Sequence, residues 1–366
     1  MKKTVSLILA ILMLVIAFSA CAPTTAPVAA ATESAVPAEK TEPVATQPSS
    51  EKKPFKVAVV LGVGGLGDGS YNDNIWEGFV RAQNELGVEV QCVEPMELSE
   101  TMTHHMELAK SGEYDVIFGV SVECEEAVIA AATAYPEQQF VIINDKLEGY
   151  DNIVAFDVSS PETVFPMGVL AGLVTKTNKI GLVIGMESQL MSDECNAPFI
   201  AGAKYANPDC EVLIKYVGGW ADSTTGKELT LTLVQEGCDV IMPYAGGSGM
   251  GVFAAAEEAD FWAIGAGSNL NSLAPTKTIA SCVFYYGNLV MDYIKMAMEG
   301  NLPTEVVVAG LKEKGVGYTF DGSEANLDPA IVSELDAICQ KVIDGTIVVP
   351  KTWDSLDATI AANAAN

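Results

Sequence analysis

The stretch that decides the fold is KVAVVLGVGGLGDGSYNDNIWEGFVRAQNELGVEVQCV, residues 56–93. It begins with a short apolar run that is typical of a buried strand. Apolar residues then recur at helical spacing from Asn72 to Leu86, and Gly87 follows as a stop signal, so this segment is predicted to be a helix. Val88–Val93 is predicted to be a second strand. The folded part of the chain therefore opens with a β-α-β unit.

The same alternation continues along the chain in two successive sets. Further strands are predicted at residues 115–120, 140–143, 153–156, 180–184, 212–217, 240–242 and 263–265. Repeated β-α units predict parallel sheets with helices on both faces, and two sets predict an α/β protein with two Rossmann-like lobes. Because ligands of such sheets bind beyond the carboxyl ends of the strands, we expect a site in the cleft between the lobes.

The N-terminal residues indicate export. Lys2 and Lys3 precede an apolar run that is short for a membrane span and ends in small residues, so residues 1–20 are predicted to be a signal peptide. Cys21 follows directly, as in a bacterial lipoprotein signal, and is the predicted lipidation site. The alternative is ordinary secretion, with Cys21 playing no part.

A flexible tether is predicted at residues 21–54. The segment is rich in Ala, Thr, Pro, Ser and Glu, and such a composition cannot bury enough apolar surface to offset the entropy of ordering. We therefore expect a folded body that is lipid-anchored to a cell membrane at its extracytoplasmic face.

The charge of the chain restricts its partners. The formal net charge is −28. This charge argues against nucleic acid and against docking onto anionic lipid, both of which need a basic surface. Arg81 is the only arginine, which disfavours nucleotides and free amino acids as ligands, because arginine usually binds phosphate and carboxylate groups. The alternative explanation for the single arginine is a compositional bias of the genome.

Cysteine and histidine residues predict neither a metal site nor an active site. The cysteines beyond Cys21 have no metal-knuckle spacing, and most lie in or beside apolar runs, so buried free thiols are expected. His104 and His105 are the only histidines, and adjacent helical residues point in different directions. We therefore expect no metal, no cofactor and no enzymatic activity.

A glycine-rich loop, Gly62–Gly67, matches the G-x-G-x-x-G pattern of dinucleotide-binding proteins. It leaves open a second class of function, a dinucleotide-dependent oxidoreductase. However, the predicted helix begins only near Asn72, and Glu94 comes later than a ribose-binding acid should. We interpret the glycines as a cleft loop that allows close approach of the backbone.

The segment Asp68–Gly78, DGSYNDNIWEG, resembles the signature of the basic membrane protein family, whose members are similar to purine-nucleoside receptors of ABC transporters. Further blocks follow in the order of the family, at residues 114–117, 162–172, 226–228, 245–252 and 342–350. The resemblance extends from about Lys56 to Pro350.

This resemblance implies a type I periplasmic-binding-protein fold, with two lobes joined by a three-segment hinge. The crossovers are expected near residues 157–160, 281–284 and 316–320. The N-terminal lobe would comprise residues 55–158 and 285–315, the C-terminal lobe residues 159–284 and 316–350, and a C-terminal tail residues 351–366. The lobes would close on a small solute and dock on an ABC permease, with a separate ATPase driving uptake.

The family sandwiches a flat heterocycle between two aromatic rings, and the matching positions here are Tyr71 and Trp220. Stacking suits purines, because both ring faces are apolar and the edges carry hydrogen-bonding groups. The alternative is that both residues serve only in packing. The full set of ligand-binding candidates is Gly62, Asp68, Ser70, Tyr71, Asn72, Asn144, Asp145, Trp220, Asp222, Gly246, Gly267, Asn269 and Phe284.

Several of these positions depart from the family pattern. Gly62 and Gly267 stand where the family has aspartates, and Phe284 stands where it has a lysine. Either Asn144 or Asp145 matches the aspartate that ends the fourth strand. The loss of carboxylates weakens the case for a plain nucleoside but not for a flat ring. We expect an ABC receptor for a neutral planar heteroaromatic solute, first a purine nucleoside or nucleobase, with riboflavin as the alternative. A sensor with the same fold is a further alternative function.

Overall fold

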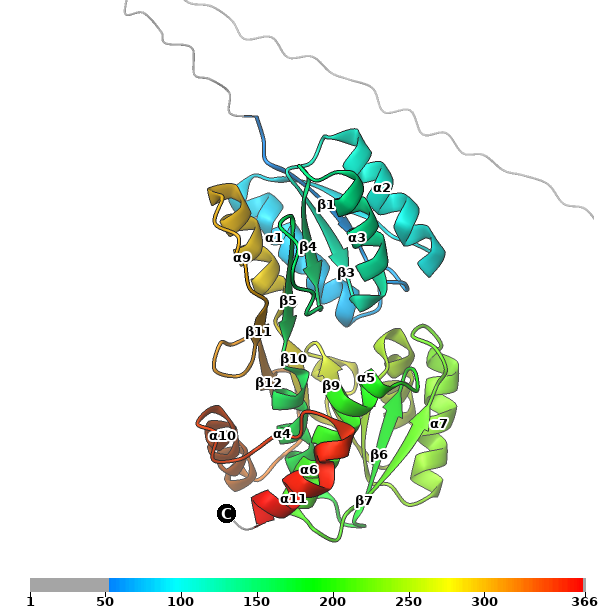
Figure 1. Ribbon diagram of the computed structural model, residues 1–366. Coiled ribbons are helices and arrows are strands. Elements are labelled where there is room, and N and C mark those ends of the chain that lie inside the picture. The colour runs from blue at the N-terminus through cyan, green and yellow to red at the C-terminus, as the bar shows by residue number, and fades with distance from the viewer. Residues whose placement is uncertain (1–52, 365–366) are drawn as a thin grey trace, which may run out of the picture. The chain divides into compact units, whose positions relative to one another are not determined.

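A computed structural model describes residues 53–364 of the chain (Figure 1). The predicted signal peptide, the lipidation site at Cys21 and the predicted tether up to residue 52 lie outside the described residues. Over residues 53–364, no helix combines the length and the apolar character that crossing a bilayer requires.

The first lobe is built on a six-stranded parallel sheet with the order β11-β5-β4-β3-β1-β2. Its strands are β1 (Lys56–Val60), β2 (Glu89–Val93), β3 (Val116–Val120), β4 (Gln139–Ile143), β5 (Ile153–Val158) and β11 (Val307–Ala309). The central strands are apolar throughout because helices cover both faces of the sheet.

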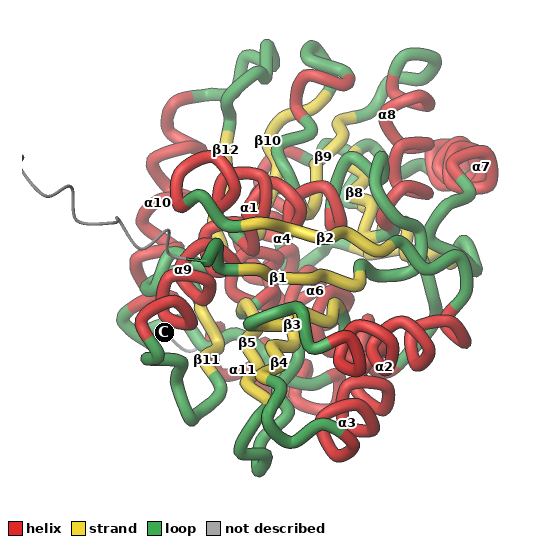
Figure 2. Tube along the Cα trace, turned by 90° about the horizontal axis from the view of Figure 1, so that it is seen from above, coloured by secondary structure: helices red, strands yellow, loops and turns green. Residues whose placement is uncertain are grey.

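Two pairs of helices cover this sheet, as Figure 2 shows from above. They are α1 (Tyr71–Leu86) with α9 (Tyr286–Glu299) on one face, and α2 (Thr101–Ser111) with α3 (Glu125–Ala134) on the other. Helix α1 buries Ile75, Phe79 and Ala82 and ends where Gly87 adopts the left-handed conformation, with a φ of 69°. The predicted apolar face and stop signal of this helix are therefore confirmed.

The second lobe repeats the arrangement with the strand order β12-β10-β9-β8-β6-β7, in which only β12 is antiparallel. The strands are β6 (Lys179–Ile184), β7 (Glu211–Tyr216), β8 (Val240–Tyr244), β9 (Trp262–Gly267), β10 (Thr278–Phe284) and β12 (Val316–Thr319). The α/β fold with two largely parallel sheets is therefore confirmed.

The helices of the second lobe also lie on both faces of its sheet. One face carries α4 (Ser160–Val174), α6 (Ala197–Ala206), α10 (Pro329–Ile343) and α11 (Leu356–Ala364), and the other carries α7 (Ser223–Gln235) and α8 (Met250–Ala256). A short helix, α5 (Gln189–Met191), leads into a π-helical turn at Ser192–Asn196 just before α6.

The chain passes between the lobes three times. The crossovers lie at Ser159, at Tyr285 and over residues 310–315. Residues 281–284 belong to β10 and residues 316–319 to β12, so the second and third crossovers lie directly beside the segments near which they were expected.

The segment after Pro350 is not a tail outside the lobes, which corrects the sequence-based expectation. It forms a short 3₁₀ turn at Trp353–Ser355 and the helix α11, which packs against α6. Leu356 enters the main core of the second lobe. The side chain of Asn363 accepts a hydrogen bond from the Val348 amide at 3.1 Å and donates one to the Val348 carbonyl at 2.8 Å.

We expect Asn363→Ala to lower the free energy of unfolding by about 1–2 kcal/mol, because it leaves the amide and the carbonyl of Val348 without their side-chain partner. Urea denaturation monitored by circular dichroism measures this change. The control is Asp357→Asn in the exposed face of the same helix, which should change stability by less than about 0.5 kcal/mol. Equal stabilities for the two variants would contradict the expectation.

The cysteines of the described part are free thiols, as predicted. Cys92 is half-buried, and Cys124, Cys195, Cys210, Cys238, Cys282 and Cys339 are buried. Burial raises the pKa of the Cys92 thiol to about 11 and that of Cys282 to about 12, so these thiols are protonated at neutral pH. Among residues 53–364, no group of His, Cys, Asp and Glu side chains is arranged to hold a metal ion.

Candidate solute-binding site

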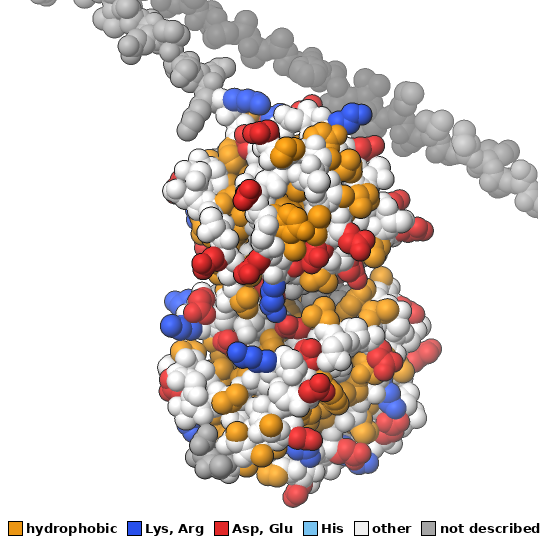
Figure 3. Space-filling model, viewed as in Figure 1, with side chains coloured by type: hydrophobic (Ala, Val, Ile, Leu, Met, Phe, Trp, Pro, Cys, Tyr) orange, Lys and Arg blue, Asp and Glu red, His pale blue; other side chains and the backbone are white. Residues whose placement is uncertain are grey.

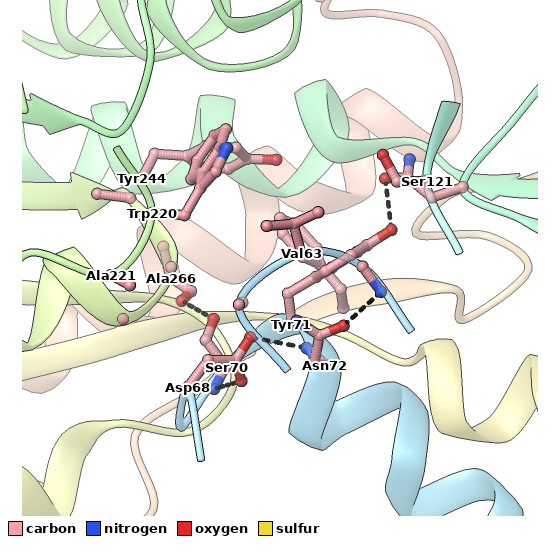
Figure 4. Close-up of a pocket in the computed structure, with 18 of the residues that line it drawn as sticks. Val63, Asp68, Ser70, Tyr71, Asn72, Ser121, Trp220, Ala221, Tyr244 and Ala266 are labelled. Carbon is pink, nitrogen blue, oxygen red and sulfur yellow. Dashed lines mark hydrogen bonds between the residues drawn. The ribbon is translucent and has the colours of Figure 1, made fainter. Parts of the chain in front are cut away.

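A cavity of about 460 Å³ lies at the carboxyl ends of the strands and is lined from both lobes. This is where parallel sheets bind ligands. The structure brings most of the expected residues together in its lining, namely Gly62, Asp68, Ser70, Tyr71, Asn72, Asn144, Trp220, Gly246, Gly267 and Phe284. Figure 4 shows several of them around the space.

The glycine-rich loop forms one wall of the cavity. Carboxylates of the protein itself accept hydrogen bonds from its backbone N–H groups. Glu94 accepts a hydrogen bond from the Leu66 amide at 2.9 Å. Asp73 accepts from the amides of Gly67 and Gly69, each at 2.8 Å. Asp68 accepts from the amides that open helix α1, including that of Asn72 at 2.8 Å.

These contacts give no support to the dinucleotide alternative. A pyrophosphate group needs free N–H groups at a helix N-terminus. Here, carboxylates already accept from the loop amides, and a phosphate would meet their negative charges. Helix α1 also begins at Tyr71, well past the third glycine of the motif, as the sequence indicated.

Tyr71 is held in place by a relay of hydrogen bonds within the first lobe. Its phenol donates to Oδ1 of Asn144 at 2.9 Å, and the Asn144 amide group donates to Oδ1 of Asp157 at 2.7 Å. Asn144 has a φ of 64°, a left-handed conformation that asparagine tolerates better than most residues. The Tyr71 ring also meets Tyr286 edge-on, with 5.5 Å between centroids and planes at 90°.

Trp220 approaches the cavity from the second lobe, and Figure 4 shows it across the space from Tyr71. Its carbonyl accepts a hydrogen bond from the Ser248 amide at 2.9 Å. The indole lies so close to Gly185 that a Cβ atom there would overlap the ring. Glycine at position 185 thus makes room for the indole and supports one side of it.

Aromatic rings continue between these two walls. Phe284 contacts Tyr244 with ring centroids 6.0 Å apart and Tyr286 with centroids 6.2 Å apart, and Tyr286 in turn contacts Tyr71. Burial raises the pKa of the Tyr71, Tyr244 and Tyr286 phenols well above the usual value. The three hydroxyls are therefore neutral at physiological pH and can donate or accept hydrogen bonds.

The two lobes also meet directly at Ser70. Its hydroxyl donates to the Ala266 carbonyl at 3.2 Å, and its carbonyl accepts from the Ser268 hydroxyl at 3.1 Å. Gly267 has a φ of 97°, and a Cβ atom there would overlap the Ser70 hydroxyl. Glycine at position 267 is thus required by the contact between the lobes.

Three of the expected residues lie outside the cavity lining. Asp145 is buried and accepts from the Lys146 amide, and burial raises its pKa. Asp222 caps α7 by accepting from the Thr225 amide at 3.0 Å. Asn269 donates to the Asp321 carbonyl at 3.1 Å. Of the two alternatives that end β4, it is Asn144 that faces the cavity.

Other lining residues were not expected, and they include Val63, Ser121, Glu194, Tyr244 and Tyr286. Tyr244 ends β8, and Ser121 follows β3, so the rule that ligands bind at carboxyl ends of strands could have found both. Tyr286 follows the second crossover. Glu194 lies in the π-helical turn, for which the sequence carries no clear signal.

The charged groups of the cavity are all acidic. Asp68, Glu123 and Glu194 line it, and among the described residues no Lys or Arg side chain does. Acidic side chains also spread over both lobes on the face that Figure 3 shows. An anionic solute would therefore lose its hydration without gaining a cationic partner.

Two α/β lobes, three crossovers and a solute-sized cavity between the lobes define a binding protein of the type I periplasmic class. Comparisons with known proteins agree. The profile of the family described as "ABC transporter substrate-binding protein PnrA-like" matches residues 55–353. The chain belongs to this family and has the substrate-binding role of an ABC transporter component.

Individual proteins support this assignment. The chain is 29% identical to an ABC transporter nucleoside-binding protein of Lactococcus lactis, over 82% of this chain and 90% of the relative. It is 31% identical to an uncharacterized lipoprotein of Pyrococcus abyssi, over 75% of this chain and 71% of the relative. The solved structure of a solute-binding protein of an Aeropyrum pernix ABC transporter has a TM-score of 0.74 and 27% identity, over 85% of this chain and 98% of that one.

Proposed function

We propose that this protein is the receptor of an ABC importer for a neutral planar heteroaromatic solute, with a purine nucleoside or nucleobase as the first candidate. The solute would lie between Tyr71 of the first lobe and Trp220 of the second. The loaded protein would deliver it to a permease driven by a separate ATPase, and the receptor itself would catalyse no reaction. A lipid on Cys21 would hold it at the extracytoplasmic face of the membrane, and relatives named lipoproteins support this anchor.

The lining of the cavity is the observation that carries the proposal. Aromatic side chains from both lobes face a space of about 460 Å³, which lies within the range of small-molecule sites. An aromatic wall favours a flat ring, because stacking uses both of its apolar faces. The absence of Lys and Arg from the described lining favours a solute without negative charge.

Polar groups at the edges of the cavity fit the edges of a heterocycle. Neutral phenols, the Asn144 amide and the Ser160 hydroxyl offer donors and acceptors beside the aromatic faces. The named nucleoside-binding relative from Lactococcus lactis supports a nucleoside as the solute. Riboflavin, which offers a larger flat ring, is the alternative for the same aromatic surface.

Isothermal titration of the purified folded part with guanosine, hypoxanthine and riboflavin tests the proposal. We expect saturable binding of guanosine or hypoxanthine. Guanosine 5′-monophosphate, the charged control, should bind at least about tenfold more weakly than guanosine, because its phosphate would face an acidic cavity. Tighter binding of riboflavin than of either purine would assign the alternative solute. No binding of any of the three would overturn the proposal of a flat heterocycle.

A further inference from the structure

The three acidic residues of the cavity differ in their hydrogen bonds and in their exposure to solvent. Asp68 already accepts several backbone hydrogen bonds at the start of α1. Glu123 is exposed to solvent. Glu194 lines the cavity with only 17% of its side chain exposed. It is therefore the carboxylate best placed to meet a bound solute away from bulk water.

The local backbone places Glu194 in this position. It lies in the π-helical turn Ser192–Asn196, between the short helix α5 and helix α6. The next residues, Cys195 and Asn196, are buried in the second lobe, and the nearby Met191 also lines the cavity. Single π-helical turns often occur at functional sites, because the wider turn changes the direction of the side chains it carries.

Lys146 of the first lobe reaches across to this carboxylate. Its Nζ atom lies 3.4 Å from Oε1 of Glu194 and 3.2 Å from Oδ2 of Asp157. Burial works against the Lys146 ammonium, but the two carboxylates outweigh it and raise its pKa. Asp157 also accepts from Asn144, which receives the hydrogen bond of the Tyr71 phenol. The ion pair therefore joins the second lobe to the relay that holds Tyr71.

From this geometry we propose that Glu194 is a specificity-determining residue of the proposed solute site. Its carboxylate, positioned by Lys146, accepts a hydrogen bond from an N–H or O–H group on the edge of the bound ring or sugar. This inference rests on the proposed function and narrows the solute class. A heterocycle with donor groups at its edge is selected over one with only acceptors, because acceptor lone pairs would face a negative charge.

The test compares the wild-type protein with Glu194→Gln, using guanosine as the probe in isothermal titration at pH 7.5. A charge-assisted hydrogen bond is stronger than a neutral one, so we expect affinity to fall about 10- to 100-fold. The control is Glu187→Gln, which removes an identical charge from an exposed position in the same segment and should leave affinity within about twofold.

A pH profile separates this role from a structural one. Burial raises the pKa of Glu194, and Lys146 works in the opposite direction. The ionised acceptor is present above that pKa, so wild-type affinity should fall as the pH falls through it. Asp157 and the phenols of Tyr244 and Tyr286 also face Glu194. All of these groups remain in Glu194→Gln. In that variant, the fall in affinity that is due to protonation of Glu194 should therefore be absent from the pH profile.

A second variant keeps the test decisive if Glu194→Gln folds poorly. Lys146→Met retains the carboxylate but removes its cationic partner, so the midpoint of the pH profile should move to higher pH. Suppose that the wild-type protein binds guanosine. If Glu194→Gln then has the same affinity and pH profile, or if the midpoint does not move in Lys146→Met, the role of Glu194 is overturned while the proposed function stands. If the wild-type protein binds none of guanosine, hypoxanthine and riboflavin, the proposed function itself fails.

Discussion

Replacing Gly202 by alanine is expected to lower the free energy of unfolding by about 3 kcal/mol, because helices α4 and α6 touch at this residue. A Cβ atom at position 202 would overlap the Phe165 carbonyl and lie 2.9 Å from the Val169 nitrogen. A Cβ atom at Gly168 of α4 would likewise overlap the Phe199 carbonyl of α6. Neither backbone can move aside as a flexible side chain could, so the two helices would have to separate.

Urea denaturation monitored by circular dichroism measures this loss, and a lower midpoint with an unchanged slope would show that stability itself has changed. The matched control is Gly219→Ala in the second lobe, where a Cβ atom would meet nothing within 4 Å. Its stability should stay within about 0.5 kcal/mol of the wild type. If Gly202→Ala were as stable as this control, the close helix contact would be wrong.

The alternation of strands and helices could be predicted from the sequence, because each element carries its own periodicity. The apolar run at residues 56–61, the helical spacing of α1 and Gly87 are all local signals, and the structure places the elements there. The contact at Gly202 could not be predicted in this way. It depends on which helix of the same lobe packs against α6. A single sequence does not show which residues will pack against a given glycine.

In the cavity, too, some residues could be predicted from the sequence and others could not. The resemblance to the family pointed to Tyr71 and Trp220, and their positions after strands agreed with the rule for parallel sheets. Asp222 lies outside the cavity lining and caps α7, because an acidic residue after a glycine-rich turn serves well as a helix cap. Glu194 was missed because a π-helical turn shifts the side-chain direction away from the ordinary helical period.

The structure shows what surrounds two of the positions that were expected to depart from the family pattern, Gly267 and Phe284. Gly267 touches Ser70 of the opposite lobe, so a longer side chain there would hold the lobes apart at this point. Phe284 lies against Tyr244 and Tyr286 and extends the aromatic surface. At these two positions the chain therefore has a close backbone contact and an apolar ring in place of polar side chains.

Stacking leads to the second prediction. Trp220→Ala should weaken guanosine binding by about 1–3 kcal/mol, or roughly 5- to 150-fold, the range for one lost base-aromatic contact. The effect should exceed that of a simple loss of area, because the indole is supported by Gly185 on one side and is therefore already in place before the solute arrives. Isothermal titration of the wild type and the variant measures the change.

The control for this prediction is Trp353→Ala, which removes the same kind of side chain from an exposed position outside the cavity lining. Its affinity for guanosine should match the wild type. Thermal unfolding of both variants establishes that each is folded before titration, since Trp220 also packs against the core of the second lobe. Unchanged affinity in a folded Trp220→Ala protein would place the solute away from the indole. The two-ring clamp would then have to be replaced by a site built on Tyr71 and the neighbouring phenols alone.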